Sequence, residues 1–293
     1  MGRVLYNNGK WKGIWNLPKY QEMRDRIKES FKDLVFVEDG HKYYINGEEI
    51  TCVSNVIHQF QEHFDAPTKA RECSERYWND ETSIYFHMTP AEIEEAWIKN
   101  SQNACALGSE RHEFGESCFW FMTEQYDKIL PEFKDRLRED GGFEAIQPKE
   151  IAIVKYWEDL PACFIPIAAE NLTYRKDLGY AGTFDILFYY DAELNGGTAD
   201  QSGAVIFDYK TNKDLYKNFK GKTLLYPLEG LLDCPLSIYK AQLSLYELSL
   251  RKIGFHVIGR RLIWLRPDES YDKIPLESYA DRLEQYLLIH KPS

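Results

Sequence analysis

Hydrophobic residues are concentrated in two neighbouring stretches that predict β-strands. Residues 183–190 are rich in aromatic and branched apolar side chains, and residues 204–209 form an apolar run that ends in charge. Turn-forming residues lie between them, in Asn195-Gly196-Gly197 and Gln201-Ser202-Gly203. We therefore expect two strands joined by a polar connection, with the rest of the chain arranged around them.

Periodic hydrophobic positions predict helices along much of the remaining chain. A capping box opens the longest helix, because Thr89 is followed by proline and then by Glu92 three residues on. This helix is expected to break near Gly108, and Gly254 is expected to end a later helix. The predicted helices cover residues 18–34, 67–78, 89–126, 131–139, 148–157, 239–253 and 276–289, with a short one ending near residue 60 and capped by Thr51 or Ser54. Further strands are predicted at residues 35–37, 42–45, 164–174 and 257–265.

These elements indicate an α/β protein with a mixed central β-sheet flanked by helices and a helical N-terminal part. A chain of 293 residues can bury the core of one large domain. We expect a single domain over residues 1–293, in which residues 1–145 are mainly helical and residues 146–293 form the core. No apolar run approaches the roughly 20 residues of a membrane span, so we expect no membrane partner.

Composition narrows the compartment and the partners. The six cysteines are scattered without a C-x-x-C pair, which is typical of reduced thiols in a cytoplasmic protein. The net charge of -11 argues against a general nucleic-acid coat protein, but phosphate binding needs only a local basic strip. The candidates for that strip are Arg71, Arg76, Arg111, Arg175, Lys176, Lys213, Lys217, Lys220 and Lys222. Aromatic side chains either stack on bases there or belong to the core, as for Tyr77, Trp78, Trp120 and Tyr216.

Two carboxylates and a lysine occur on the two central strands. Asp185 interrupts the first strand, Asp208 ends the second, and Lys210 follows two residues later on the same face. Carboxylate oxygens are ligands that Mg²⁺ prefers, and a lysine beside them can stabilise charge that develops on a phosphoryl group. The alternative is a strand-end ion pair near an isolated acid, which is the commoner meaning of D-x-K alone.

Further polar positions accompany these strands. His112 and Glu116 are four residues apart on the long predicted helix, so they share a face. Glu170 interrupts an otherwise apolar strand, and Gln242 lies one helical turn before Tyr246. Taken singly, each has an ordinary explanation: a packed histidine, an acid at a sheet edge, or a polar stripe where a helix meets a sheet.

The order of these motifs resembles the PD-(D/E)XK nuclease superfamily, specifically its RecB-like branch. The motifs are G-x-x-x-H-x-x-x-E, a strand glutamate, G-T-F-D, D-Y-K-T and Q-L-S-L-Y. The layout is most similar to the mitochondrial genome maintenance exonuclease and related phage exonucleases. Residues 51–57 also resemble the T-S-V-x-x-x-I stretch that opens many of these proteins, so the resemblance covers residues 51–246.

The resemblance implies a restriction-endonuclease-like core and a set of ligands for Mg²⁺ or Mn²⁺. Asp185 and Asp208 would be the main ligands, joined by the backbone carbonyl of Tyr209. His112 would complete the metal shell, and Glu170 would ligate through water or hold a second ion.

The resemblance also implies roles around the metal. Lys210 would position the attacking water and stabilise the transition state, and Thr211 would support the strand end. Gln242 and Tyr246 would line the site and contact DNA phosphate. Some relatives carry an iron–sulfur cluster held partly by cysteines after this helix, but no cysteine follows Cys234, so we expect no cluster.

The function implied is that of a metal-dependent DNA exonuclease acting on single strands or free ends. Such an enzyme would work in the cytoplasm of a bacterial or phage-infected cell, alongside proteins of DNA replication, recombination or repair. Two alternatives remain: an endonuclease of restriction or structure-specific type with the same fold, and a nuclease-like DNA-binding protein that has lost catalysis. Gly221-Lys222-Thr223 lacks the context of a P-loop, so ATP use is not expected.

Overall fold

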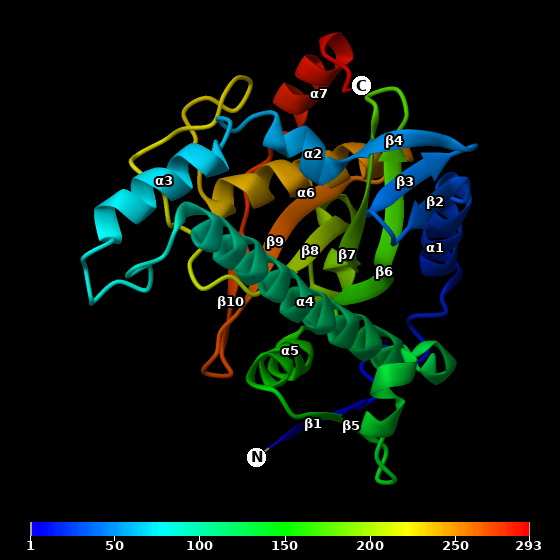
Figure 1. Cartoon of the computed structure of the whole chain (residues 1–293). Coiled ribbons are helices and arrows are strands. Elements are labelled where there is room, and N and C mark those ends of the chain that lie inside the picture. The colour runs from blue at the N-terminus through cyan, green and yellow to red at the C-terminus, as the bar shows by residue number, and fades with distance from the viewer. Residues whose placement is uncertain (1, 293) are drawn as a thin grey trace. The chain divides into compact units, whose positions relative to one another are not determined.

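The computed structural model describes residues 2–292 and shows an α/β protein built on a mixed, multi-stranded sheet flanked by helices (Figure 1). The described chain divides into two compact units, one formed by residues 2–61 with 111–292 and the other by residues 62–110. This division falls within the stretch expected to form the helical N-terminal part, and residue 145 does not mark a boundary between compact units. Strands β2, β3 and β4 precede residue 145 and still belong to the main sheet.

The first unit contains the strands. They are β1 (Arg3–Tyr6), β2 (Leu34–Val37), β3 (Lys42–Ile45), β4 (Glu48–Cys52), β5 (Gly142–Ala145), β6 (Phe164–Arg175), β7 (Tyr180–Tyr190), β8 (Gly203–Lys210), β9 (Val257–Leu265) and β10 (Tyr271–Pro275). Its helices are α1 (Pro18–Ser30), α2 (Val53–His58), α5 (Pro148–Asp159), α6 (Pro235–Lys252) and α7 (Ala280–Ile289), with 3₁₀ turns η1 (Tyr126–Lys128), η2 (Pro131–Arg136), η3 (Ala192–Asn195) and η4 (Ala199–Gln201). Helix α3 (Ala66–Tyr77) lies in the second unit, and α4 (Pro90–Met122) begins there and continues into the first.

The central strand β7 has one continuous edge and one divided edge. β6 pairs antiparallel with it along its whole length. On the other edge, β8 pairs antiparallel with residues 186–190, and β4 pairs parallel with Tyr180 and Ala181 only. Residues 182–185 therefore face no strand on that edge among the described ladders, and the sheet forks there.

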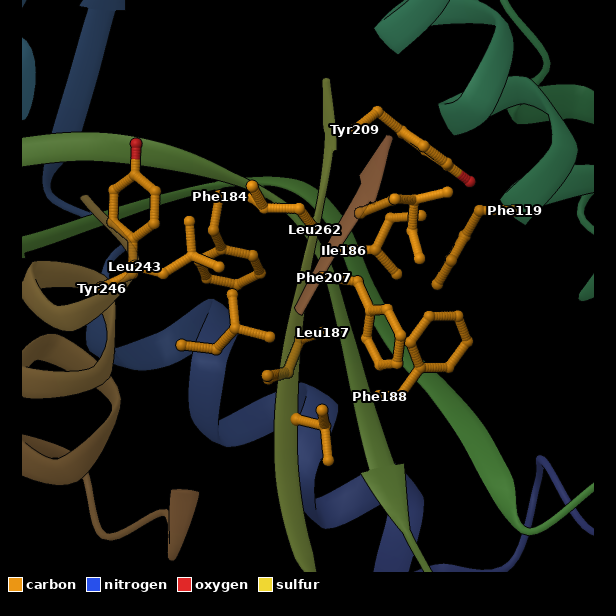
Figure 2. Packing of buried hydrophobic residues seen from close by; sticks show 14 of the residues in the cluster. Phe119, Phe184, Ile186, Leu187, Phe188, Phe207, Tyr209, Leu243, Tyr246 and Leu262 are labelled. Carbon is orange, nitrogen blue, oxygen red and sulfur yellow. The ribbon is translucent and has the colours of Figure 1, made fainter. Parts of the chain in front are cut away.

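Helices and aromatic packing fix the strands around this fork. Phe184 and Leu187 point toward the side of the sheet where Tyr246 of α6 lies, whereas Ile186 and Phe188 point to the opposite side (Figure 2). In a regular strand Phe184 and Ile186 would share a face, so the alternation of side chains breaks at the residue between them. Each of these large side chains is buried and contributes about 1.5–3 kcal/mol relative to exposure.

Most of the predicted elements are confirmed. The two central strands form the antiparallel pair β7–β8, and β6, β9, α1, α5, α6 and α7 occupy the expected regions. At the start of α4, Glu92 Oε2 accepts from the Thr89 amide at 2.8 Å, as the capping box predicts. Gly254 follows α6 with a φ of 89°.

Other predictions were wrong in detail. The long helix α4 does not break near Gly108, because the helical hydrogen-bonding pattern continues through it. Helix α2 has Cys52 at its N-cap position, between the two expected capping residues Thr51 and Ser54, and the Cys52 side chain makes no cap hydrogen bond. The helix expected at residues 131–139 is the 3₁₀ turn η2. Strands β1, β4, β5 and β10 were not predicted.

None of the helices found in residues 2–292 has the length and apolar character needed to cross a bilayer.

Candidate metal centre

The register of the sheet brings three acidic residues from adjacent strands into one row. The β6–β7 ladder pairs Ala169 with Ile186 and Asn171 with Phe184, so its register sets Glu170, which lies between, opposite Asp185. The last pair of the β7–β8 ladder joins Ile186 to Phe207. The same register, continued by one residue, sets Asp208 beside Asp185. Each acid comes from a different strand, so the row exists only when the three strands pair.

The backbone is irregular around this row, at the fork of the sheet. The Tyr209 amide donates to Asp185 Oδ2 at 2.7 Å, so a side chain occupies the position of a strand partner. Glu170 has a φ of 42°, in the left-handed region that non-glycine residues rarely adopt. Such a conformation costs about 1–3 kcal/mol and persists only where surrounding contacts impose it. These departures from regular pairing aim the carboxylates at one another.

Helix α4 supplies a nitrogen ligand to the row. His112 Nδ1 lies 3.0 Å from Asp185 Oδ2 and 3.8 Å from Glu170 Oε1. One turn later, Gly115 lies against the Tyr209 ring, and a Cβ at that glycine would come within 2.4 Å of Tyr209 Cε2. The absence of a side chain at Gly115 therefore lets the helix approach β8 closely enough for His112 to reach the acids.

The electrostatics of the row indicate a shortage of positive charge. Burial and then the neighbouring Asp185 raise the pKa of Asp208 to about 6. Burial and Asp185 also raise the pKa of Glu170. Burial opposes protonation of His112, but the adjacent Asp185 carboxylate outweighs it and raises the pKa of His112 to about 9. For Asp185 itself, burial raises the pKa, and the larger combined effect of His112, Lys210 and the Tyr209 amide lowers it.

Asp208 and Lys210 form a buried ion pair at the end of β8. Lys210 Nζ lies 2.5 Å from Asp208 Oδ2, and the Asp208 side chain is 1% exposed. Among the described residues, neither oxygen of Asp208 accepts a hydrogen bond of regular geometry. The lysine therefore balances the charge of Asp208 without saturating its oxygens, which leaves lone pairs that a cation can use.

The donor set fits a hard divalent cation. Ligand atoms of His112, Glu170 and Asp185 all lie within 4.8 Å of one another. Two carboxylates and an imidazole are less favourable ligands for Mg²⁺ than a shell made only of oxygens. The same three ligands also suit Mn²⁺. Asp208 does not belong to this close group and is paired with Lys210. Glu170, expected to ligate only through water or to hold a second ion, is the second acid in the group.

Helix α6 contributes a packed pair. Gln242 Nε2 donates to the Tyr246 hydroxyl at 3.2 Å. Tyr246 is 4% exposed and lies against Gly182, where an added Cβ would be 2.9 Å from its ring. The phosphate contact expected of Tyr246 stays a prediction, and its ring is buried at the seam between α6 and the fork. Gln242 is half-buried beside it.

The candidate phosphate-binding residues separate into two groups. Arg111 is 7% exposed and its guanidinium faces the buried Glu150 at 3.4 Å, and its contact with substrate stays a prediction. Lys213, Lys217 and Lys220 are exposed, and Lys222 is half-buried, all on the segment between β8 and α6.

Other residues support this edge of the site. The Thr211 carbonyl accepts from Lys149 Nζ at 2.7 Å, so the strand end is held through the backbone. Glu116 accepts from Trp120 Nε1 at 3.0 Å, and burial raises its pKa. Trp120 is thus half-buried against its own helix, whereas Tyr216 is exposed.

Sequence reasoning missed Tyr239, Asn212 and Trp264, which surround Lys210. The Lys210 ammonium lies over the Tyr239 ring. Asn212 accepts hydrogen bonds from the Tyr239 hydroxyl and from Trp264 Nε1. The available signal was the position of Tyr239 three residues before Gln242, on the same helical face.

No protein-family model matches the sequence, and no curated protein is significantly similar to it. The geometry of the site therefore carries the functional argument.

Proposed function

We propose that this protein is a metal-dependent deoxyribonuclease with a restriction-endonuclease-like core. It would hydrolyse phosphodiester bonds as an exonuclease, on single strands or at free DNA ends, with Mg²⁺ or Mn²⁺ as its cofactor and no iron–sulfur cluster. The observation that carries the proposal is the meeting of His112, Glu170 and Asp185 within 4.8 Å beside a buried Asp208–Lys210 pair.

The residues of the chain divide the work. His112, Asp185 and Asp208, with the Tyr209 carbonyl, would hold the cation, and Glu170 would hold it directly or through water. A bound divalent cation supplies a Lewis acid for a phosphoryl oxygen and lowers the pKa of a coordinated water. The Lys210 ammonium would orient that water and stabilise negative charge in the transition state, an effect strengthened by its burial.

The basic segment between β8 and α6 supports DNA as the substrate. It follows the site directly in the sequence and carries Lys213, Lys217 and Lys220 at exposed positions in an otherwise acidic protein. Exposed aromatic side chains accompany these lysines, with Tyr216 57% and Phe219 63% exposed. Lysines interleaved with aromatic rings are typical of surfaces that bind unpaired strands.

The test is a nuclease assay on end-labelled linear and covalently closed circular DNA, single- and double-stranded, with Mg²⁺ or with EDTA. We expect linear DNA to lose nucleotides from its ends in Mg²⁺, circular DNA to stay intact, and EDTA to abolish cleavage. Cleavage of the circles would replace the exonuclease by an endonuclease, and full activity in EDTA would refute a metal enzyme.

Two variants locate the activity. Lys210→Ala should keep DNA binding and lose turnover by a factor on the order of 10² or more. Lys240→Ala is the matched control, because this partly buried lysine pairs with Glu277 at 2.9 Å on the neighbouring segment and has no proposed catalytic role. Equal rates for Lys210→Ala and the wild type would show that the activity lies elsewhere.

A further inference from the structure

The Lys210 ammonium has a second contact besides Asp208. Its Nζ lies 4.5 Å from the centroid of the Tyr239 ring, which comes from the first turns of α6. A cation over a tyrosine face is attracted by the electron density of the ring, and the attraction grows when water is excluded. The lysine side chain is only 11% exposed, so this contact is made in a largely desolvated position.

The Tyr239 ring is itself held in place. Its hydroxyl donates to Asn212 Oδ1 at 2.7 Å. The backbone carbonyl of Asn212 accepts a hydrogen bond from Trp264 Nε1 at 2.7 Å, and Trp264 is a buried residue of β9. This chain of hydrogen bonds links α6, the end of β8 and β9, so the ring has little freedom to move away from the ammonium.

The two partners of Lys210 differ in one decisive respect. Asp208 attracts the ammonium but is also a proposed metal ligand, so its charge is shared when a cation is bound. The Tyr239 ring is neutral and offers no ligand of that kind. It can therefore hold Nζ in the same place whether or not the carboxylate is engaged.

We propose that Tyr239, locked by Asn212 and Trp264, is a positioning residue that fixes the ammonium of Lys210 toward the reacting phosphate. This inference rests on the proposed nuclease function. It implies that turnover depends on the electron density of the Tyr239 ring and not only on its shape. Substrate binding and cation binding should be independent of it, because the ring belongs neither to the proposed metal ligands nor to the proposed DNA-binding lysines.

The test replaces Tyr239 by phenylalanine and then by phenylalanines carrying one, two and three ring fluorines, incorporated as unnatural amino acids. Fluorine withdraws electron density and leaves the shape nearly unchanged. We expect kcat to fall stepwise from the Tyr239→Phe variant to the trifluoro ring, by about tenfold in total. KM and the Mg²⁺ concentration for half-maximal rate should stay constant.

The matched control is the same series at Tyr279, whose ring lies under Lys240 at 6.0 Å, a pairing outside the site. We expect kcat to be unaffected there. A kcat that does not depend on fluorination at position 239, or a series that changes only KM, would overturn the positioning role. A loss that is complete in Tyr239→Phe, with no further trend on fluorination, would assign the effect to the hydroxyl and Asn212 instead, and would overturn the role of the ring.

A second readout separates this inference from the proposed function. Fluorination at position 239 should lower the melting temperature when Lys210 is present, and by a smaller amount in a Lys210→Met background. A shift that is equal in both backgrounds would show that ring and ammonium are not coupled. Absence of metal-dependent cleavage by the wild type would instead reject the nuclease, and with it the positioning role, while the unfolding data still report the contact.

Discussion

The absence of a side chain at Gly115 allows α4 to approach the sheet closely. The Tyr209 ring lies where a Cβ would be, and a Cβ at 2.4 Å from Cε2 is far inside van der Waals contact. Tyr209 is 1% exposed and is packed by other aromatic rings, including Tyr156, so it has little room to retreat. The position of His112, one helical turn away, therefore depends on Gly115, which has no side chain and makes no chemical contribution to the site.

Gly115→Ala should lower the free energy of unfolding by about 1–3 kcal/mol, because an overpacked core must shift. In an unconstrained helix the same change would raise it by about 0.5–1 kcal/mol. Urea denaturation monitored by circular dichroism measures the difference. Adding Tyr209→Leu should remove most of the penalty of the alanine relative to Tyr209→Leu alone. A stabilising Gly115→Ala would show that the ring yields easily.

The residues of the site differ in how far the sequence could predict them. Asp185, Asp208 and Lys210 lie on one hairpin, so strand periodicity alone suggested their proximity. Glu170 and His112 come from elements separated in the chain, and only the resemblance to a family joined them to the hairpin. Tyr246 and Arg111 illustrate the limit, because their burial depends on packing by residues far away in the sequence.

At the scale of elements, the segment between β8 and α6 is ordered although it lacks long helices or strands. Leu215, Leu224 and Leu228 are buried, and the Asn218 amide donates to the Lys222 and Asp233 carbonyls, both at 2.8 Å. The Lys222 amide donates to the Phe219 carbonyl at 3.4 Å and closes a tight turn. The fixed base of the segment presents its lysines in a defined arrangement.

Changing Lys217, Lys220 and Lys222 together to Gln should weaken DNA binding for all sequences alike. Each lysine that neutralises a phosphate contributes about 0.7 to the salt slope for single strands, so the slope should flatten by about two units. Fluorescence anisotropy over a salt series measures this, in an Asp208→Asn background that prevents cleavage.

The matched control for this loop changes three exposed lysines elsewhere, Lys12, Lys28 and Lys134. It has the same net charge as the loop variant, so a loss of affinity from charge alone would appear in both. If the loop variant keeps its affinity and its salt slope, the lysines serve only to solvate the segment.

Arg175 connects the end of β6 to two helices. It is 5% exposed, and its guanidinium donates to Glu284 of α7 at 2.9 Å and to the Leu248 carbonyl of α6 at 3.2 Å. It also makes two hydrogen bonds to Asp177, both 2.9 Å long. These bonds lower the pKa of Asp177 below its ordinary value.

Because the folded-state pKa of Asp177 is lowered, the ionised carboxylate stabilises the fold at pH values above the unfolded-state pKa, near pH 4. This stabilisation is lost as the pH falls through the folded-state pKa. Asp177→Asn should therefore make the free energy of unfolding less dependent on pH between about 4 and 2. The effect should be about 1 kcal/mol or less, because Asp177 is 43% exposed. Urea titrations across this range test it, with the exposed Asp200→Asn as control; identical slopes in both variants would exclude a special role for Asp177.

At the scale of the whole molecule, the sequence predicted the α/β class and the central strands because their hydrophobic runs are long and bounded by turns. It could not predict the fork, because the two strands that share one edge of β7, namely β4 and β8, come from distant parts of the chain. The compact unit of residues 62–110 also carries no signal at its end, since α4 continues across the boundary without interruption.

A protein that concentrates buried carboxylates at one point should gain stability when a cation binds there. A ligand that binds only the folded state at 100 times its dissociation constant adds about 2.7 kcal/mol. We expect Mg²⁺ and Mn²⁺ to raise the melting temperature of the wild type and to leave that of Asp185→Asn unchanged. Asp177→Asn, whose substitution lies outside the metal centre, should retain the full shift. Equal shifts in the wild type and in Asp185→Asn would place the cation elsewhere.

The hydrogen bond from the Tyr209 amide to Asp185 makes one peptide group a natural probe of the site. Most amides in a strand face a carbonyl, whose charge is constant, whereas this amide faces a carboxylate at 2.7 Å. Any change in the charge around that carboxylate polarises the N–H bond. In a ¹H–¹⁵N correlation spectrum, the Tyr209 resonance should move progressively as Mg²⁺ is added and should lie upfield in Asp185→Asn. A single backbone signal would then report the occupancy of the centre without any measurement of turnover.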